Sequence, residues 1–234
     1  VSQSHHLASR LFDFCQPLLK ALNAHMDKRL VRTFFLSLLG ILSCDNPKTS
    51  LVLSNLGGLL LNPRQAPAGT KRLERLLSSE KWEAQQVHDF LMRYAEQLLE
   101  HEHNSPVLAL WDESVLEKPE SFALESLMPV SSSKGKRLTH IKPGFFTPPR
   151  GPIFVPGFNC MGVMLVHGNQ QRFAAMKLFS SRAQEPKKPT QARLELFEQL
   201  APRWGQNVVH VFDRGFCGDP WLKQLEAQNA KWLV

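Results

Sequence analysis

Residues 158–180 read FNCMGVMLVHGNQQRFAAMKLFS, and this stretch decides the fold class. Two apolar runs flank the pair Gly168-Asn169, a dipeptide typical of the tight turn between two antiparallel strands. We therefore predict a β-hairpin, with one strand over 158–167 and the returning strand over 172–180.

The segments on either side of this hairpin extend it into a mixed sheet. Short apolar runs, of the kind found in buried strands, alternate downstream with amphipathic stretches of helical period. We expect further strands at 107–111, 207–212 and 231–234 and helices at 190–200 and 219–229. Hairpin strands beside parallel strands joined by crossover helices predict a mixed α/β layer.

The first part of the chain, residues 1 to 103, has apolar residues at helical spacing and is expected to be all-α. A short helix at 50–61, a loop, and a short basic helix at 70–77 capped by Thr70 form the pattern of a helix-turn-helix. An ordinary helical bundle with a basic surface explains the same pattern equally well. The predicted α/β region then spans 104–234, and it contains an insertion of little periodicity at 114–157.

The charge of the chain favours a polyanionic partner. The 234 residues carry a formal net charge of +7 and give a sequence pI of about 9.4. Residues 126–184 contain no Asp or Glu at all, which predicts a positive surface wherever this segment folds. Nucleic acid is the first candidate partner, and a basic enzyme without such a partner is the alternative.

Composition argues against a membrane protein, a disulfide scaffold and a zinc site. The best apolar run, residues 33–44, is shorter than the ~20 residues that a transmembrane helix needs. The four cysteines are far apart in the chain and are expected to be reduced, intracellular thiols. His101 and His103 have no further Cys or His at a spacing that would complete a zinc site.

Two aspartates follow apolar strands in equivalent places, Asp112 after VLALW and Asp213 after NVVHVF. Functional groups in α/β sheets collect at the carboxyl ends of strands, and two adjacent carboxylates favour a hard divalent cation between them. A pair of Mg²⁺ ions about 4 Å apart can activate a water and stabilise the leaving oxygen of a phosphodiester. Alternatively, each aspartate only forms a turn, as Asp213-Arg214-Gly215 can do by itself.

The runs LALWDESVLEKP (108–119) and HVFDRGFCGDPWL (210–222) resemble the first two catalytic motifs of DDE-type transposases of bacterial insertion sequences. The resemblance implies a ribonuclease H-like core after a helical DNA-binding region, and metal-dependent hydrolysis and strand transfer at transposon ends. Asp112 and Asp213 would be the catalytic, metal-binding carboxylates, with Mg²⁺ as the cofactor and Mn²⁺ as its substitute. The third carboxylate of the family, a Glu on a later helix, has no counterpart before Val234.

The same resemblance implies double-stranded DNA as partner, both transposon ends and target, a dimer on DNA, and a bacterial cytoplasmic, nucleoid-associated location. Candidate DNA contacts are basic residues in the helical part, in the insertion and after the second aspartate: Lys71, Arg72, Arg75, Lys134, Lys136, Arg137, Lys142 and Arg214. Three alternatives stay open. The chain is an inactive, truncated transposase that still binds DNA, a ribonuclease H-like nuclease of another class, or a basic protein with no nucleic-acid role.

Overall fold

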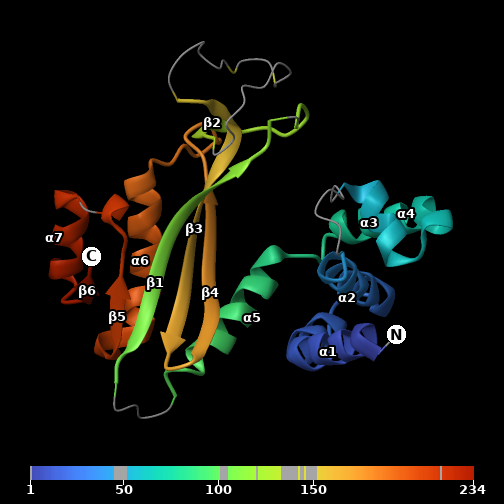
Figure 1. Ribbon diagram of the computed structural model, residues 1–234, viewed down its shortest axis with the longest axis horizontal. Coiled ribbons are helices and arrows are strands. Elements are labelled where there is room, and N and C mark those ends of the chain that lie inside the picture. Colours follow the sequence, from blue (N-terminus) through green and yellow to red (C-terminus); the bar gives the residue numbers. More distant parts are fainter. Residues whose placement is uncertain are drawn as a thin grey trace. The chain divides into compact units, whose positions relative to one another are not determined.

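The computed structural model describes residues 2–44, 52–100, 105–119, 121–132, 142, 145, 152–216 and 218–234. The chain divides into two compact units, Val1–Phe90 and Leu91–Val234, and the boundary falls inside helix α5 (Ala84–Glu96) (Figure 1). The sequence predicts a helical region over 1–103 and an α/β region over 104–234. Met92, Ala95 and Leu98 are buried in the core of the second unit.

The first unit is helical and begins with α1 (Ser2–Asn23) and α2 (Lys28–Leu42). The side chain of Asp27 caps α2 by accepting a 2.7 Å hydrogen bond from the backbone N–H of Arg29. Leu22 of α1 and Val31 and Phe34 of α2 are buried, so the two helices share an apolar seam.

Helices α3 (Leu53–Leu60) and α4 (Ala66–Leu77) are joined through the short 3-10 helix η1 (Pro63–Gln65) and pack backbone against backbone. A Cβ atom added at Gly69 would lie 2.1 Å from the carbonyl oxygen of Gly57. The expected start of the basic helix at Thr70 is wrong, because α4 starts at Ala66. Proline suits a first helical turn, and the Thr70 hydroxyl instead donates to the Ala66 carbonyl at 2.9 Å.

The second unit is built on a six-stranded mixed sheet, which confirms the predicted α/β class. The strands run in the order β2-β3-β1-β5-β6, with β4 also paired to β3. Their bounds are β1 Val107–Glu117, β2 Met128–Ser131, β3 Phe154–His167, β4 Gln170–Phe179, β5 Val208–Val211 and β6 Lys231–Leu233. β1, β5 and β6 are parallel neighbours, whereas β3 is antiparallel to β1, β2 and β4.

The predicted hairpin is present, because β3 ends at His167 and β4 begins at Gln170. Gly168 adopts φ +56°, a left-handed conformation that favours glycine in such a turn. A register irregularity at Val163/Met164 makes both Ala174 and Ala175 point into the core.

Strand β1 is longer than predicted. It continues for five residues beyond Asp112, to Glu117, because β3 pairs with it as far as Gly157. The predicted insertion therefore begins inside a strand, and it also contains β2, whose Pro129 and short length gave no periodic signal.

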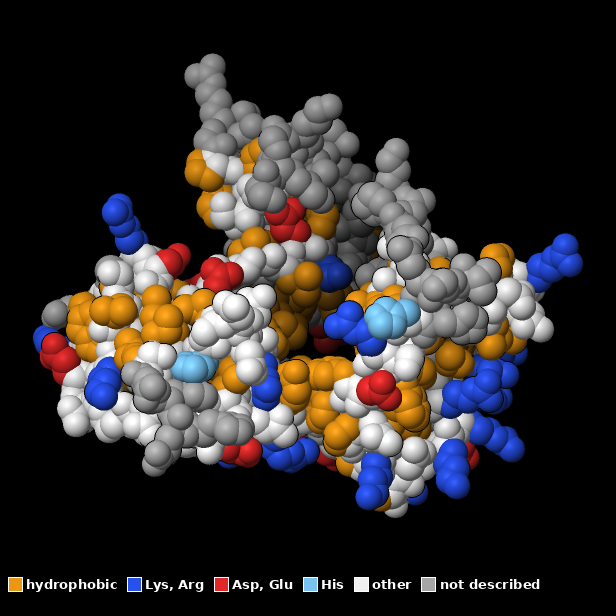
Figure 2. Space-filling model, turned by 60° about the horizontal axis from the view of Figure 1, so that its bottom comes forward, with side chains coloured by type: hydrophobic (Ala, Val, Ile, Leu, Met, Phe, Trp, Pro, Cys, Tyr) orange, Lys and Arg blue, Asp and Glu red, His pale blue; other side chains and the backbone are white. Residues whose placement is uncertain are grey.

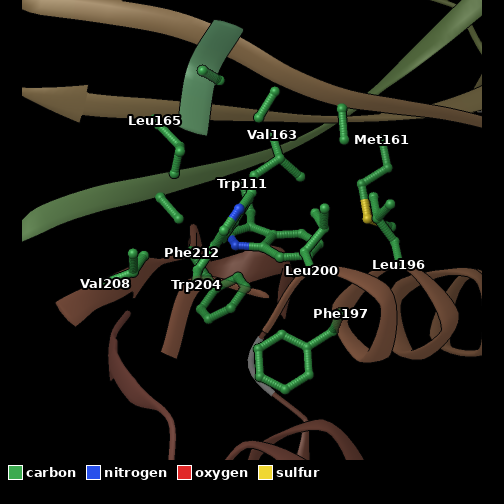
Figure 3. Packing of buried hydrophobic residues seen from close by; sticks show 14 of the residues in the cluster. Trp111, Met161, Val163, Leu165, Leu196, Phe197, Leu200, Trp204, Val208 and Phe212 are labelled. Atoms are coloured by element: carbon green, nitrogen blue, oxygen red, sulfur yellow. The ribbon is translucent and has the colours of Figure 1, made fainter. Parts of the chain in front are cut away.

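One face of the sheet is covered by α6 (Pro189–Trp204), with α7 (Asp219–Ala227) beside it (Figure 1). Trp111 lies at the centre of this core, with Val163 of β3, Leu200 of α6 and Phe212 around it (Figure 3). Large buried side chains of this kind each contribute about 1.5–3 kcal/mol. Among the described helices, none is both long and apolar enough to cross a membrane.

Candidate functional site

Asp112 and Asp213 lie level with each other at one end of the β1–β5 pair. These parallel strands are in register from Val107↔Val208 to Leu110↔Val211, and each aspartate is the second residue after the last pair. Adjacent strands are about 4.8 Å apart. Because side chains alternate between faces, Asp112 lies on the same face of β1 as Leu110, whereas Asp213 lies in the turn that follows β5.

The residues between the last pair and the aspartates show that the two segments stay adjacent. Trp111 and Phe212 are both buried on the α6 face, with ring centroids 5.6 Å apart (Figure 3). Asp112 and Asp213, the next residue in each segment, are exposed. In each segment, a buried aromatic residue is thus followed directly by an exposed aspartate.

A buried hydrogen bond holds these two strands together beneath the aspartates. The indole Nε1 of Trp111 donates to Nδ1 of His210 at 3.0 Å, and the His210 side chain is almost fully buried. Burial lowers the pKa of His210 from 6.5 to about 4, so the imidazole is neutral at pH 7 and can accept this bond. No sequence pattern predicts this role, because His210 lies inside an apolar strand.

The side chain of Asp213 is oriented by the turn that follows it. Its Oδ1 accepts a 2.9 Å hydrogen bond from the backbone N–H of Gly215, and the Phe216 N–H bonds the Asp213 carbonyl at 3.1 Å. The turn-forming role considered for Asp213 is therefore real. It occupies Oδ1 of Asp213. Among the described residues, neither Oδ2 of Asp213 nor the Asp112 carboxylate has a hydrogen-bond partner.

Arg193 of α6 connects the neighbours of both aspartates. Its Nε and Nη2 donate to Oε2 of Glu113 at 3.0 and 2.5 Å, and its guanidinium lies 4.3 Å from the ring centroid of Phe216. Glu113 follows Asp112, and Phe216 belongs to the 3-10 turn η3 (Arg214–Phe216) after Asp213. Since the Arg193 and Glu113 side chains are only 16% and 20% exposed, this contact fixes how the two segments sit against each other.

The negative charge of Asp112 affects the pKa of Cys160 on the neighbouring strand β3. Burial raises the pKa of the Cys160 thiol, and the negative charge of Asp112 raises it further. Ser114, two residues beyond Asp112, pairs directly with Cys160, which places both groups in the same part of the sheet.

The donor set of this site fits a hard divalent cation but is small. Asp112 and Asp213 offer carboxylate oxygens, the ligands that Mg²⁺ prefers, together with open positions for water. Glu113 points to Arg193 and is not a third ligand. Within the described residues, no group of three or more His, Cys, Asp or Glu side chains is placed to hold a metal ion.

The basic residues predicted to contact DNA differ in their surroundings. Lys71, Arg72 and Arg75 are exposed on α4, and Arg214 is exposed in the turn after Asp213. The Nζ atom of Lys142 donates to the carbonyl of Leu124. The predictions for Lys134, Lys136 and Arg137 fall outside the described residues.

Part of the acid-free segment 126–184 uses its positive charge internally. Arg172 donates to the carbonyl of Tyr94 at 2.7 Å and stacks on the Tyr94 ring. Lys177 pairs with Glu195 of α6 at 2.5 Å. The absence of acids in this segment therefore does not translate into an equally positive surface, because partners from other elements neutralise some of it.

The structure also brings together four arginines, of which the sequence indicated only two. Arg29 and Arg32 of α2 line the same cleft as Arg72 and Arg75 of α4, within the helical unit. Figure 2 shows Lys and Arg side chains gathered over this unit, in the right-hand part of the view (Figure 2). The signal available in the sequence was the i, i+3 spacing of each pair, but not that the pairs meet.

Comparisons with known proteins are sparse. No family model matches the chain. No curated protein matches it either. Among solved structures, the chain is similar to the Mos1 transposase paired-end complex with the left transposon end, at 12% identity and a TM-score of 0.28. The match covers 84% of this chain and 57% of the other, so the chain spans little more than half the length of that transposase.

Proposed function

We propose that this chain is a DNA transposase of the DDE type with a ribonuclease H-like core, in which Asp112 and Asp213 bind Mg²⁺. The observation that supports the proposal is the parallel register of β1 and β5, in which each aspartate is the second residue after the last pair, beside Trp111 and Phe212 in contact. The two sequence motifs that resemble the family supply the same two residues.

The chain prepares this site by fixing Asp213 and the segments that carry both carboxylates before any ion arrives. The Gly215 N–H holds Asp213, the Trp111–His210 hydrogen bond fixes the spacing of the strands, and Arg193 holds the neighbours of both aspartates. When bound, Mg²⁺ would activate a water and neutralise charge on a phosphodiester. Asp112, which has no internal hydrogen bond among the described residues, supplies the oxygens that remain free for the ion.

The reaction that fits this site is hydrolysis of a DNA phosphodiester at transposon ends, followed by strand transfer into target DNA. The net charge of +7 supports a DNA partner, and the exposed basic residues of α4 support contact with its backbone. A dimer acting on paired DNA ends belongs to the same proposal. The second candidate is an inactive transposase-derived protein that binds DNA. It is supported by the finding that no group of three or more His, Cys, Asp or Glu side chains among the described residues could hold a metal ion.

Metal binding provides a test that does not require turnover. Mn²⁺ binding to the chain is measured by electron paramagnetic resonance, beside Asp112→Asn and Asp213→Asn. Each substitution is expected to lower Mn²⁺ affinity by at least about tenfold. Glu185→Gln removes an exposed acid elsewhere in the same unit and should leave the affinity unchanged.

Mn²⁺-dependent nicking of supercoiled DNA is then measured with the same variants. Loss of nicking in both aspartate variants, with DNA binding retained, supports the enzyme. Metal binding that ignores both aspartates removes the proposed site. DNA binding without any metal binding or nicking in the unmodified chain supports the binding-only candidate.

A further inference from the structure

The helical unit contains a cleft of about 700 Å³ that is lined by arginines from two helices. Arg29 and Arg32 come from one side of α2, and Arg72 and Arg75 from one side of α4. We call this the arginine cleft. All four side chains are exposed, so their guanidinium groups are open to a ligand.

The described residues balance little of the positive charge of the arginine cleft. Among them, Asp27 is the one acidic residue that lines the cleft, and its carboxylate already caps α2 through the Arg29 N–H. Within the described part of the chain, none of the four arginines forms an ion pair. Each helix thus places two like charges three residues apart, an arrangement that is destabilising by itself.

The Asp27 carboxylate offsets part of the positive charge at one end of the cleft, because it caps the amino end of α2. The first turn of α2 contains no further acidic residue. Like charges that are kept close together despite their cost in stability are expected at functional sites. An anion in the cleft would meet guanidinium groups from both helices.

We propose that the arginine cleft binds phosphate groups of a nucleic-acid backbone. Guanidinium forks match phosphate oxygens in a bidentate geometry, and such contacts position a duplex without reading its bases. The cleft is larger than one phosphate group, which favours a strand carrying successive phosphates over a free anion. This inference rests on the DNA partner of the proposed function, but not on the metal site in the other unit.

DNA binding by fluorescence anisotropy, at a series of salt concentrations, tests the proposal on the full chain. Arg32→Gln with Arg72→Gln removes one arginine from each side of the cleft. We expect affinity for a short duplex to fall by at least about tenfold, and the slope of log affinity against log salt to decrease by about 2. The loss should be similar for duplexes of unrelated sequence, because backbone contacts carry no sequence information.

A matched control distinguishes specific binding in the cleft from general attraction between DNA and a positively charged surface. Arg10→Gln with Arg64→Gln removes the same charge from exposed positions of the helical unit that do not line the cleft. This pair should change the affinity by less than about threefold. An equal loss in both pairs would overturn the proposal in favour of general charge attraction. An unchanged affinity in the cleft pair would overturn it outright and leave the DNA partner intact.

A further arm distinguishes a small-anion site. Inorganic phosphate replaces chloride at constant ionic strength, and its binding is followed by calorimetry. Weak phosphate binding beside strong, cleft-dependent DNA binding supports the proposal. Tight, cleft-dependent phosphate binding without an effect on DNA would reassign the cleft to a free phosphate. If the unmodified chain binds no DNA, the DNA partner of the proposed function fails as well. Thermal unfolding checks that each variant is folded.

Discussion

The indole Nε1 of Trp111 donates a 3.0 Å hydrogen bond to Nδ1 of His210, across the two strands that carry the aspartates. Trp111 immediately precedes Asp112, and His210 lies three residues before Asp213. The bond requires an unprotonated Nδ1, so the protonation state of a buried histidine is linked to the spacing of the candidate site.

Acid is therefore expected to destabilise the second unit through His210. The pKa of His210 is about 4 in the folded chain because of burial, against an ordinary value of 6.5. A depressed pKa means that the stabilisation is complete above pH 6.5 and is lost as the pH falls towards 4. The free energy of unfolding should drop by about 3 kcal/mol across this range from this residue alone.

His210→Gln isolates this effect, because glutamine retains an acceptor for Trp111 and does not titrate. Urea unfolding at pH 7 and pH 4 measures both proteins. The variant should start less stable at pH 7 and lose about 3 kcal/mol less on acidification. The same pH dependence in both proteins would show that other groups cause the acid sensitivity.

Arg193 is expected to act as a positioning residue for the carboxylate pair. Arg193→Met leaves Glu113 partly buried without its partner and removes the cation above Phe216, so unfolding should become easier by about 1–3 kcal/mol. The distinctive result is a loss of Mn²⁺ affinity of at least about fivefold, although Arg193 carries positive charge and binds no metal. Arg193→Lys should recover little of it, because lysine lacks the planar fork.

The chain offers a matched control for Arg193. Arg203 donates through Nε and Nη2 to Glu96 at 2.8 Å each, a similar fork at a site away from the aspartates. Arg203→Met should cost stability and leave Mn²⁺ affinity unchanged. Equal effects on metal binding in the two variants would mean that general destabilisation, not positioning, weakens the site.

The sequence predicted the sheet better than it predicted the contacts around the site. The hairpin, the crossover helices, the start of β1 and the strand before Asp213 follow from short-range patterns, and these are the signals that periodicity and turn residues carry. The length of β1 depends on its pairing with β3, which lies some 40 residues away and leaves no local trace. The sequence does not predict the role of Arg193, because the residues on a helix face do not indicate which strand that face will cover.

The arginine cleft shows the same limit in the helical unit. The spacing of Arg72 and Arg75 indicates one basic helix face, but their meeting with α2 depends on how α3 and α4 pack. That packing is set by the Gly57–Gly69 contact. The sequence shows these only as one glycine in a short apolar helix and another in the loop expected before the basic helix.

Gly69→Ala is therefore expected to disrupt the helical unit. The added methyl would lie 2.1 Å from the Gly57 carbonyl oxygen, and this neighbour is backbone, so α3 and α4 must separate. We expect a loss of at least about 1–3 kcal/mol in unfolding free energy and weaker DNA binding, because α4 carries half of the arginine cleft.

Gly58→Ala is the control, since its nearest neighbour would be 3.6 Å away and alanine favours the helix by about 0.5–1 kcal/mol. Thermal unfolding of the two variants should move in opposite directions. A Gly69→Ala chain as stable as the unmodified protein would show that the two helix backbones are not in contact.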